Sequence, residues 1–191
     1  SGNGGSQRQA IMVIILLYIL NDKPMPIPRT TQAAILVAQN DDLVVDEIEL
    51  PRILNVGQVL VQLECSGICG SQIGEILGVK GPDKHLPHLL GHEGFGRVLD
   101  VGPGVKTVER DDNVVLHWRC GEGIESETPE YKWKGGKLNA GWVTTFNKHA
   151  VISENRCTKV SSLTDPVIGA LCGCAVTTGM GVVENNARLK S

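Results

Sequence analysis

Short apolar segments separated by turn residues follow one another along most of the chain, from Gln32 to Val160. Segments this short and this closely spaced are typical of the strands of a β-barrel or sandwich, and they leave no room for alternating βαβ units. The sequence therefore predicts a mainly β domain. The predicted strands are AAILVA, LVVDEIEL, QVLVQLECSGI, FGRVLDVG, DNVVLHW, HAVIS and CTKV.

Two stretches depart from this strand pattern. The polar stretch from Arg119 to Lys148 holds two of the three tryptophans and is predicted to be a long loop. After Val160, Asp165 and Pro166 are a start signal that precedes an apolar pattern of helical period. One or two short helices are therefore expected to close the chain.

Residues 1–30 have a different character from the rest. Ser1 to Ser6 is predicted to be a flexible leader, and Ala10 to Leu20 is an unbroken apolar run. The run follows Arg8 as in a signal peptide, but no small-residue cleavage site follows it, and it is shorter than the about 20 apolar residues that span a membrane. A targeting segment, a packing arm, an extra strand and a segment foreign to the domain are the open interpretations. We expect a strand that promotes a homodimer, joined to one domain over residues 31–191.

Charge and cysteine content exclude several classes of protein. The 191 residues have a formal net charge of −3 and no basic cluster, so nucleic acid is not an expected partner. With 41% hydrophobic residues the chain can bury a core without cross-links. The six cysteines are therefore predicted to be reduced thiols of a cytoplasmic protein, and no membrane association is expected.

Cys69, His92 and Cys174 are the residues most capable of metal chemistry. Taken alone, Cys69 fits a buried apolar side chain, and His92 in GHEG is a weak signal. Two thiolates and one imidazole together form a catalytic zinc set with an open fourth position, and such ligands favour zinc over magnesium or calcium. Cys172, two residues before Cys174, competes for the same role.

The residues around His92 resemble the zinc-containing alcohol dehydrogenase family of the medium-chain dehydrogenase/reductase superfamily. Gly91-His92-Glu93, Gly96, Gly102 and Val105 match that family's signature position by position. VGQVLVQLECSGICGS is similar to the strand before the family's first zinc cysteine, and GALCGCAVTTGMG is similar to its third-ligand helix. The resemblance runs from about Ala33 to Lys190. It implies a GroES-like, partly open β-barrel with a few short helices and a C-terminal helix.

The resemblance also implies roles for five residues. Cys69, His92 and Cys174 would hold one catalytic zinc, because Cys174 rather than Cys172 stands at the family's distance from Thr178-Gly179. Ser71 corresponds to the hydroxyl that takes the alcohol proton, although a turn serine that caps the next helix is the alternative. Glu93 corresponds to a carboxylate behind the metal, and a structural salt bridge is its alternative.

Several positions depart from the family pattern. Gln72 stands where many members have aspartate, and Gly74 stands where they have the histidine that ends the proton relay. Gln72 is therefore expected to orient His92 through its amide oxygen. Only Cys120 lies where the family's structural zinc has four cysteines, so a second zinc is not expected. Asp111 replaces a turn glycine.

A dinucleotide-binding domain is expected to be absent from these residues. GPGVKT and GMGVVE lack the glycine spacing and the strand-to-helix context that hold a pyrophosphate. The first hypothesis is therefore the zinc-binding catalytic domain of an alcohol or polyol dehydrogenase, inactive alone, that transfers hydride to NAD or NADP on the missing domain. An apolar patch is then expected near Val176 to Val183. A metal-binding or association module is the alternative, and the zinc-free quinone reductases are disfavoured because they lack the cysteines and the histidine.

Overall fold

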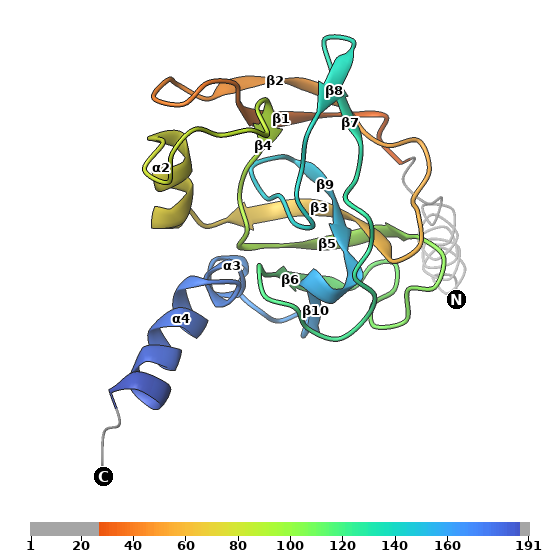
Figure 1. Ribbon diagram of the computed structural model, residues 1–191. Helices are drawn as coiled ribbons and strands as arrows, with labels where there is room; N and C mark the ends of the chain where they lie inside the picture. Colours follow the sequence, from red (N-terminus) through yellow and green to blue (C-terminus); the bar gives the residue numbers. More distant parts are fainter. Residues whose placement is uncertain (1–26, 188–191) are drawn as a thin grey trace, which may run out of the picture.

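The computed structural model describes residues 27–187, so the strand and homodimer predicted for Ala10 to Leu20 lie outside the described residues. Two antiparallel five-stranded sheets form the body of the domain (Figure 1). The first sheet has the order β4 (His88–Leu89), β1 (Thr30–Leu36), β2 (Val44–Glu49), β7 (Tyr131–Trp133), β8 (Gly136–Leu138). The second has the order β10 (Cys157–Val160), β6 (Asn113–Leu116), β5 (Gly94–Val101), β3 (Gln58–Ser66), β9 (His149–Ser153).

The segment just before β9 joins the two sheets along one side. On the β1 side, Ala34 N donates to Phe146 O at 2.8 Å and Lys148 N donates to Gln32 O at 2.9 Å. On the β3 side, Leu63 N donates to Lys148 O at 2.9 Å. These bonds nearly close the sheets into a barrel, and the predicted mainly β, barrel-like fold is confirmed.

Alternation along the strands separates two apolar clusters. Leu60 of β3 lies in a cluster between the two sheets, whereas Val59 and Val61 point into a second cluster. The first cluster contains Ala33, Ile35, Ile48, Leu50, Leu60, Leu89, Leu99, Tyr131, Leu138 and Val151. The second contains Val59, Val61, Val98, Val108, Val114, Leu116, Ala150, Ile152 and Cys157. These clusters make the barrel a rigid support for the segments between its strands.

The helices are short, and α2, α3 and α4 lie outside the barrel (Figure 1). They are α2 (Gly70–Ile76), the 3₁₀ turn η1 (Glu154–Arg156), α3 (Pro166–Cys172), α4 (Ala175–Gly181) and the π-helical turn η2 (Val182–Asn186). Asp165 begins α3 as expected, since its Oδ1 accepts from Val167 N at 2.9 Å and from Ile168 N at 3.1 Å. α3 packs on the second sheet through Ala170, which contacts Phe95 and Val115.

The chain beyond α3 leaves the barrel surface (Figure 1). Val176, Met180, Val182 and Val183 are partly or largely exposed, so the predicted apolar patch is present. Within residues 27–187 no single helix is long and apolar enough to span a membrane. α3 and the following α4–η2 helix reach that length and apolar content only when taken together, and they are bent by 50° relative to each other.

The structure revises one local prediction and shows the backbone conformation of Asp111. The stretch from Arg119 to Lys148 is not one long loop, because it contains the β7–β8 hairpin. Its turn, Lys134 (φ 50°) and Gly135 (φ 78°), has the two left-handed residues that a tight hairpin needs. Asp111 keeps the left-handed turn of the glycine it replaces, with φ 73°, and its carboxylate accepts from Arg97 Nη2 at 2.8 Å.

Candidate metal centre

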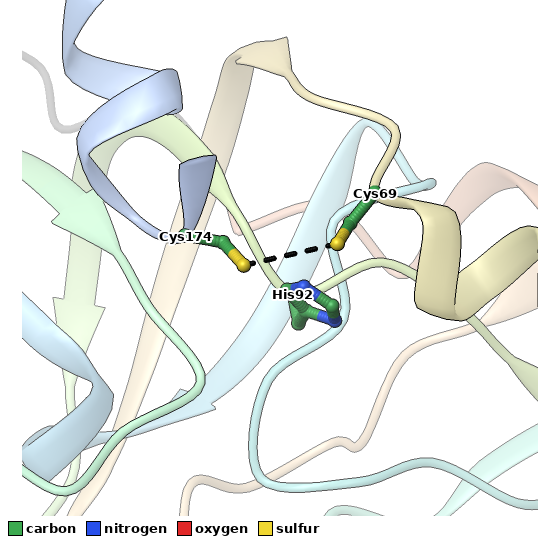
Figure 2. A group of neighbouring side chains, drawn as sticks. All are labelled: Cys69, His92 and Cys174. Atoms are coloured by element: carbon green, nitrogen blue, oxygen red, sulfur yellow. Dashed lines mark hydrogen bonds between the residues drawn. The ribbon is translucent and has the colours of Figure 1, made fainter. Parts of the chain in front are cut away.

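The structure brings together Cys69, His92 and Cys174 from three separate segments (Figure 2). Cys69 precedes α2, His92 lies between β4 and β5, and Cys174 lies between α3 and α4. The candidate ligand atoms all lie within 4.8 Å of one another, and the two sulfurs are 3.8 Å apart. Two sulfurs at about 2.3 Å from one tetrahedral zinc would be separated by about 3.8 Å. The donor set and its spacing therefore fit a zinc ion.

His92 is positioned by the backbone of Gly91. Gly91 has φ 93°, and a Cβ there would collide with the Thr145 side chain, so only glycine fits the turn that leads into His92. The Nδ1 atom of His92 contacts the side-chain amide of Gln72, while its buried Nε2 has no hydrogen-bond partner within residues 27–187. Burial lowers the pKa of His92 and outweighs the negative charges of Glu93 and Glu75, which act to raise it. The ring is therefore neutral at pH 7, as a metal ligand must be.

Cys69 stands at the start of α2. The Ser71 backbone N–H, followed by the Ser71 hydroxyl, donates to the sulfur and lowers the pKa of the Cys69 thiol. Apart from this sulfur, the buried Ser71 Oγ has no partner in the described part of the chain. Ser71 is the second residue of α2 and Cys69 is its N-cap, so Ser71 does not cap the helix.

Cys174 is held in place by close packing around Gly173. A Cβ on Gly173 would collide with the carbonyl oxygen of Leu116 and crowd Glu93, so only glycine lets this segment approach the barrel. Burial, more than the neighbouring Cys69 and Glu93, raises the pKa of the Cys174 thiol. Cys172 packs instead against the cluster of Phe95, Val115 and Ala170. The structure therefore places Cys174, and not Cys172, beside Cys69 and His92.

The Glu93 side chain, 2% exposed, connects the histidine segment to the Cys174 segment. Its Oε2 accepts a hydrogen bond from Ala175 N at 3.1 Å, and its backbone oxygen accepts from Gly67 N at 3.1 Å. The carboxylate thus binds backbone next to a candidate ligand, which differs from the salt bridge considered as its alternative role. This contact positions Cys174 relative to His92.

The contact between Gln72 and His92 differs from the expected one. Gln72 Oε1 accepts from Cys69 N at 3.2 Å, so the amide nitrogen faces His92 Nδ1. The expectation that the amide oxygen orients His92 is therefore wrong in this structure. The physical reason is the capping arrangement at α2, in which the third helical residue reaches back to the N-cap backbone.

The remaining cysteines lie outside this group. Cys65 packs beside Phe95, Cys157 is buried in the second cluster, and the exposed Cys120 donates to Glu125 Oε2 at 3.3 Å. Among the described residues, Cys69, His92 and Cys174 are the only group of histidine, cysteine or acidic side chains close enough together to share a metal ion.

A cavity of about 830 Å³ adjoins the His92 side of the group. It is lined by Gln72 and His92, by residues 80–85 and by residues 139–143. Its lining is mixed: apolar surface from Leu89, Leu90 and Val143 lies beside polar side chains that include Glu75, Lys80 and Asn139. Trp118, just beyond β6, does not line this cavity and is 48% exposed.

Gln39 holds one wall of this cavity, a role that the sequence did not indicate. Its amide donates to Gly81 O at 3.1 Å and accepts from Asp83 N at 3.0 Å, and Asp83 also contacts His88 Nε2 at 2.7 Å. Gln39 and Asp83 are separated by 44 positions, so no local motif could have revealed the contact.

Known proteins share both this sequence pattern and this fold. Residues 55–162 match the family described as alcohol dehydrogenase GroES-like domain. S-(hydroxymethyl)glutathione dehydrogenase of Haemophilus influenzae is 29% identical, with 84% of this chain and 48% of the relative covered. Alcohol dehydrogenase class-3 of Cereibacter sphaeroides is 29% identical, with 84% and 49% covered.

Solved structures share the fold of this chain. An alcohol dehydrogenase zinc-binding domain protein from Burkholderia ambifaria superposes with a TM-score of 0.74 at 24% identity, over 85% of this chain and 50% of that one. An alcohol dehydrogenase from Thermotoga maritima superposes with a TM-score of 0.62 at 26% identity, over 82% and 48%. The chain spans about half the length of the curated relatives it matches. With its family match and a barrel that carries the Cys-His-Cys group, this chain belongs to the family of alcohol dehydrogenase GroES-like domains.

Proposed function

We propose that this chain is the zinc-binding catalytic half of a dehydrogenase that oxidises an alcohol to a carbonyl compound, with NAD or NADP as hydride acceptor. The observation that carries the proposal is the group formed by Cys69, His92 and Cys174, whose sulfur–sulfur distance of 3.8 Å fits one tetrahedral zinc. A bound zinc would supply Lewis acidity toward the alcohol oxygen.

Three features of the chain support the substrate side of this proposal. The Ser71 hydroxyl is buried next to the Cys69 sulfur without another partner, so it is free to accept the proton of an alcohol bound there. The cavity beside His92 offers about 830 Å³ for the rest of the substrate. Its lining combines polar side chains with apolar surface, which suits an alcohol that carries both polar and apolar groups.

The nucleotide is proposed to bind to a part of the protein outside these residues. Residues 27–187 contain no glycine-rich turn of the dinucleotide-binding type between a strand and a helix, and the apolar surface of α4 and η2 is exposed. The isolated chain is therefore expected to bind zinc but neither NAD nor NADP. A cytoplasmic location and a homodimer stay predictions.

A second candidate function is a metal-binding or association module without catalysis. The exposed apolar surface of α3 and α4, which includes Ile168, Leu171 and Met180, favours association. The two candidates differ in one respect: only the first requires that a longer protein containing this domain turns over an alcohol.

Elemental analysis of the purified chain tests the metal site. We expect one equivalent of zinc, its loss in Cys174→Ser, and its retention in the matched control Cys172→Ser, which changes the same residue type two positions away. Two equivalents, or zinc retained by Cys174→Ser, would contradict the ligand set.

The same domain within its longer protein tests the chemistry. We expect alcohol-dependent reduction of NAD or NADP that Ser71→Ala lowers by about 10²-fold or more without loss of zinc. Zinc binding without turnover of any alcohol, polyols included, would favour the second candidate. Calorimetry of the isolated chain with either nucleotide should show no binding. Micromolar binding would contradict the proposal that the nucleotide binds outside these residues.

A further inference from the structure

We propose that Gln72 weakens zinc binding. Once His92 becomes a ligand, the Cys69 backbone N–H and the His92 Nδ1–H both face the Gln72 amide, and its single oxygen can accept from only one of them. This inference rests on the proposed zinc site and concerns how readily that site is filled. It makes Gln72 a positioning residue that acts through His92. The three residues involved are Cys69, Gln72 and His92.

The hydrogen bonds around Gln72 define the tautomer of His92. Gln72 is 3% exposed, so its amide depends on protein partners. Its Oε1 accepts from Cys69 N at 3.2 Å, which leaves its NH₂ group against His92 Nδ1. An NH₂ group only donates, so Nδ1 must accept, and the single proton of the neutral ring then lies on Nε2. In this arrangement the protonated nitrogen is the buried Nε2 that has no partner in the described residues.

Ligation through Nε2 requires the opposite tautomer. The proton must move to Nδ1, and Nδ1–H then needs an acceptor, as the free ring nitrogen of a metal-bound histidine usually has. Cys69 N–H still needs an acceptor too. If the Gln72 amide turns its oxygen toward Nδ1–H, its NH₂ group faces Cys69 N–H. In either orientation one donor opposes another donor, so loading costs one buried hydrogen bond.

A carboxylate at position 72 would remove this conflict. Glutamate has the same length and shape as glutamine, and its two oxygens can accept from Cys69 N–H and from His92 Nδ1–H together. Its negative charge would also strengthen His92 as a ligand. Changes to such outer partners typically alter metal affinity by about 10- to 100-fold. Gln72→Glu is therefore expected to bind zinc about 10- to 100-fold more tightly than the wild-type chain.

Zinc competition with a chromophoric chelator and ¹⁵N NMR of the imidazole rings test the proposal on the purified chain. In the zinc-free wild type the His92 signals, assigned with a His92→Asn variant, should report the Nε2–H tautomer, and in Gln72→Glu the Nδ1–H tautomer. Zinc affinity should rise in Gln72→Glu and should not rise in Gln62→Glu, which adds the same charge on β3 at a half-buried position. Melting temperatures of the zinc-free chains separate metal affinity from folding.

The outcomes distinguish this proposal from the zinc site itself. An Nδ1–H tautomer in the zinc-free wild type, or a zinc affinity of Gln72→Glu no greater than that of the wild type, would overturn the role of Gln72 and leave the site standing. Failure of every variant to bind zinc would overturn the proposed function, and the loading role of Gln72 with it.

Discussion

Glu154 is a buried carboxylate that ties two loops to the end of the barrel. Its side chain accepts four hydrogen bonds: from Lys106 N at 2.6 Å, Thr107 N at 2.8 Å, Thr107 Oγ1 at 3.0 Å and Ile124 N at 2.8 Å. The residue is 1% exposed. Burial alone would raise the pKa of Glu154, but the backbone N–H groups of Lys106, Ile124 and Thr107 outweigh it and hold the pKa below its usual value.

Glu154→Gln removes the charge and one of the two acceptor atoms. The amide oxygen can replace Oε1, but the three bonds made there become neutral and are then about half as strong. The NH₂ group must face Ile124 N–H, and an unsatisfied buried donor costs about 1–3 kcal/mol. We expect a loss of about 3 kcal/mol in the free energy of unfolding, which corresponds to a fall in Tm of about 6–12 °C for a chain of this size.

Urea and thermal unfolding of the wild type, Glu154→Gln and the control Glu130→Gln provide the measurement. Glu130 has a side chain 81% exposed and meets Lys137 at 3.5 Å, so its substitution should change stability by less than about 0.5 kcal/mol.

The pH dependence gives a second readout. Because the folded pKa of Glu154 is lowered, its contribution is present above the unfolded pKa of about 4.3 and disappears as pH falls through the folded pKa. The difference between wild type and Glu154→Gln should thus be constant from about pH 5 to 8 and shrink below about pH 4. A variant as stable as the wild type, or a difference unchanged at low pH, would refute this reasoning.

Two further predictions concern the metal-site backbone and the thiols. Gly173→Ala should lower both zinc affinity and stability, because its Cβ would collide with the Leu116 carbonyl oxygen. In the control Gly179→Ala a Cβ meets nothing within 4 Å, so this variant should be as stable as the wild type or more stable by up to about 1 kcal/mol. Equal zinc binding by the two variants would show that Gly173 has no role in placing the site. Iodoacetamide should modify the exposed Cys120 in the native chain and spare Cys157, whose thiol is buried and whose pKa burial raises; mass spectrometry of tryptic peptides checks this, and modification of Cys157 before unfolding would contradict the packing.

Local sequence patterns determined the strands because alternation and turn residues act over a few neighbouring positions. HAVIS coincides with β9 and CTKV with β10, and Asp165-Pro166 begins α3. The β7–β8 hairpin was missed, although Gly135-Gly136 beside alternating apolar residues was a usable signal. The two-residue strand β4 has no such signal, since it exists only through its pairing with β1.

The candidate site depended on both the sequence and the tertiary structure. The sequence alone was enough to identify the three candidate ligands. The glycines around His92 and the distance from Cys174 to Thr178-Gly179 resemble the family pattern, and that resemblance pointed to them. Their assembly is a tertiary result, because Cys69 and Cys174 are 105 positions apart and meet only where α3 packs on the second sheet. The sequence also could not predict which end of the Gln72 amide faces His92. The amide has two ends, and only the position of the Cys69 backbone at the start of α2 decided which end faces His92.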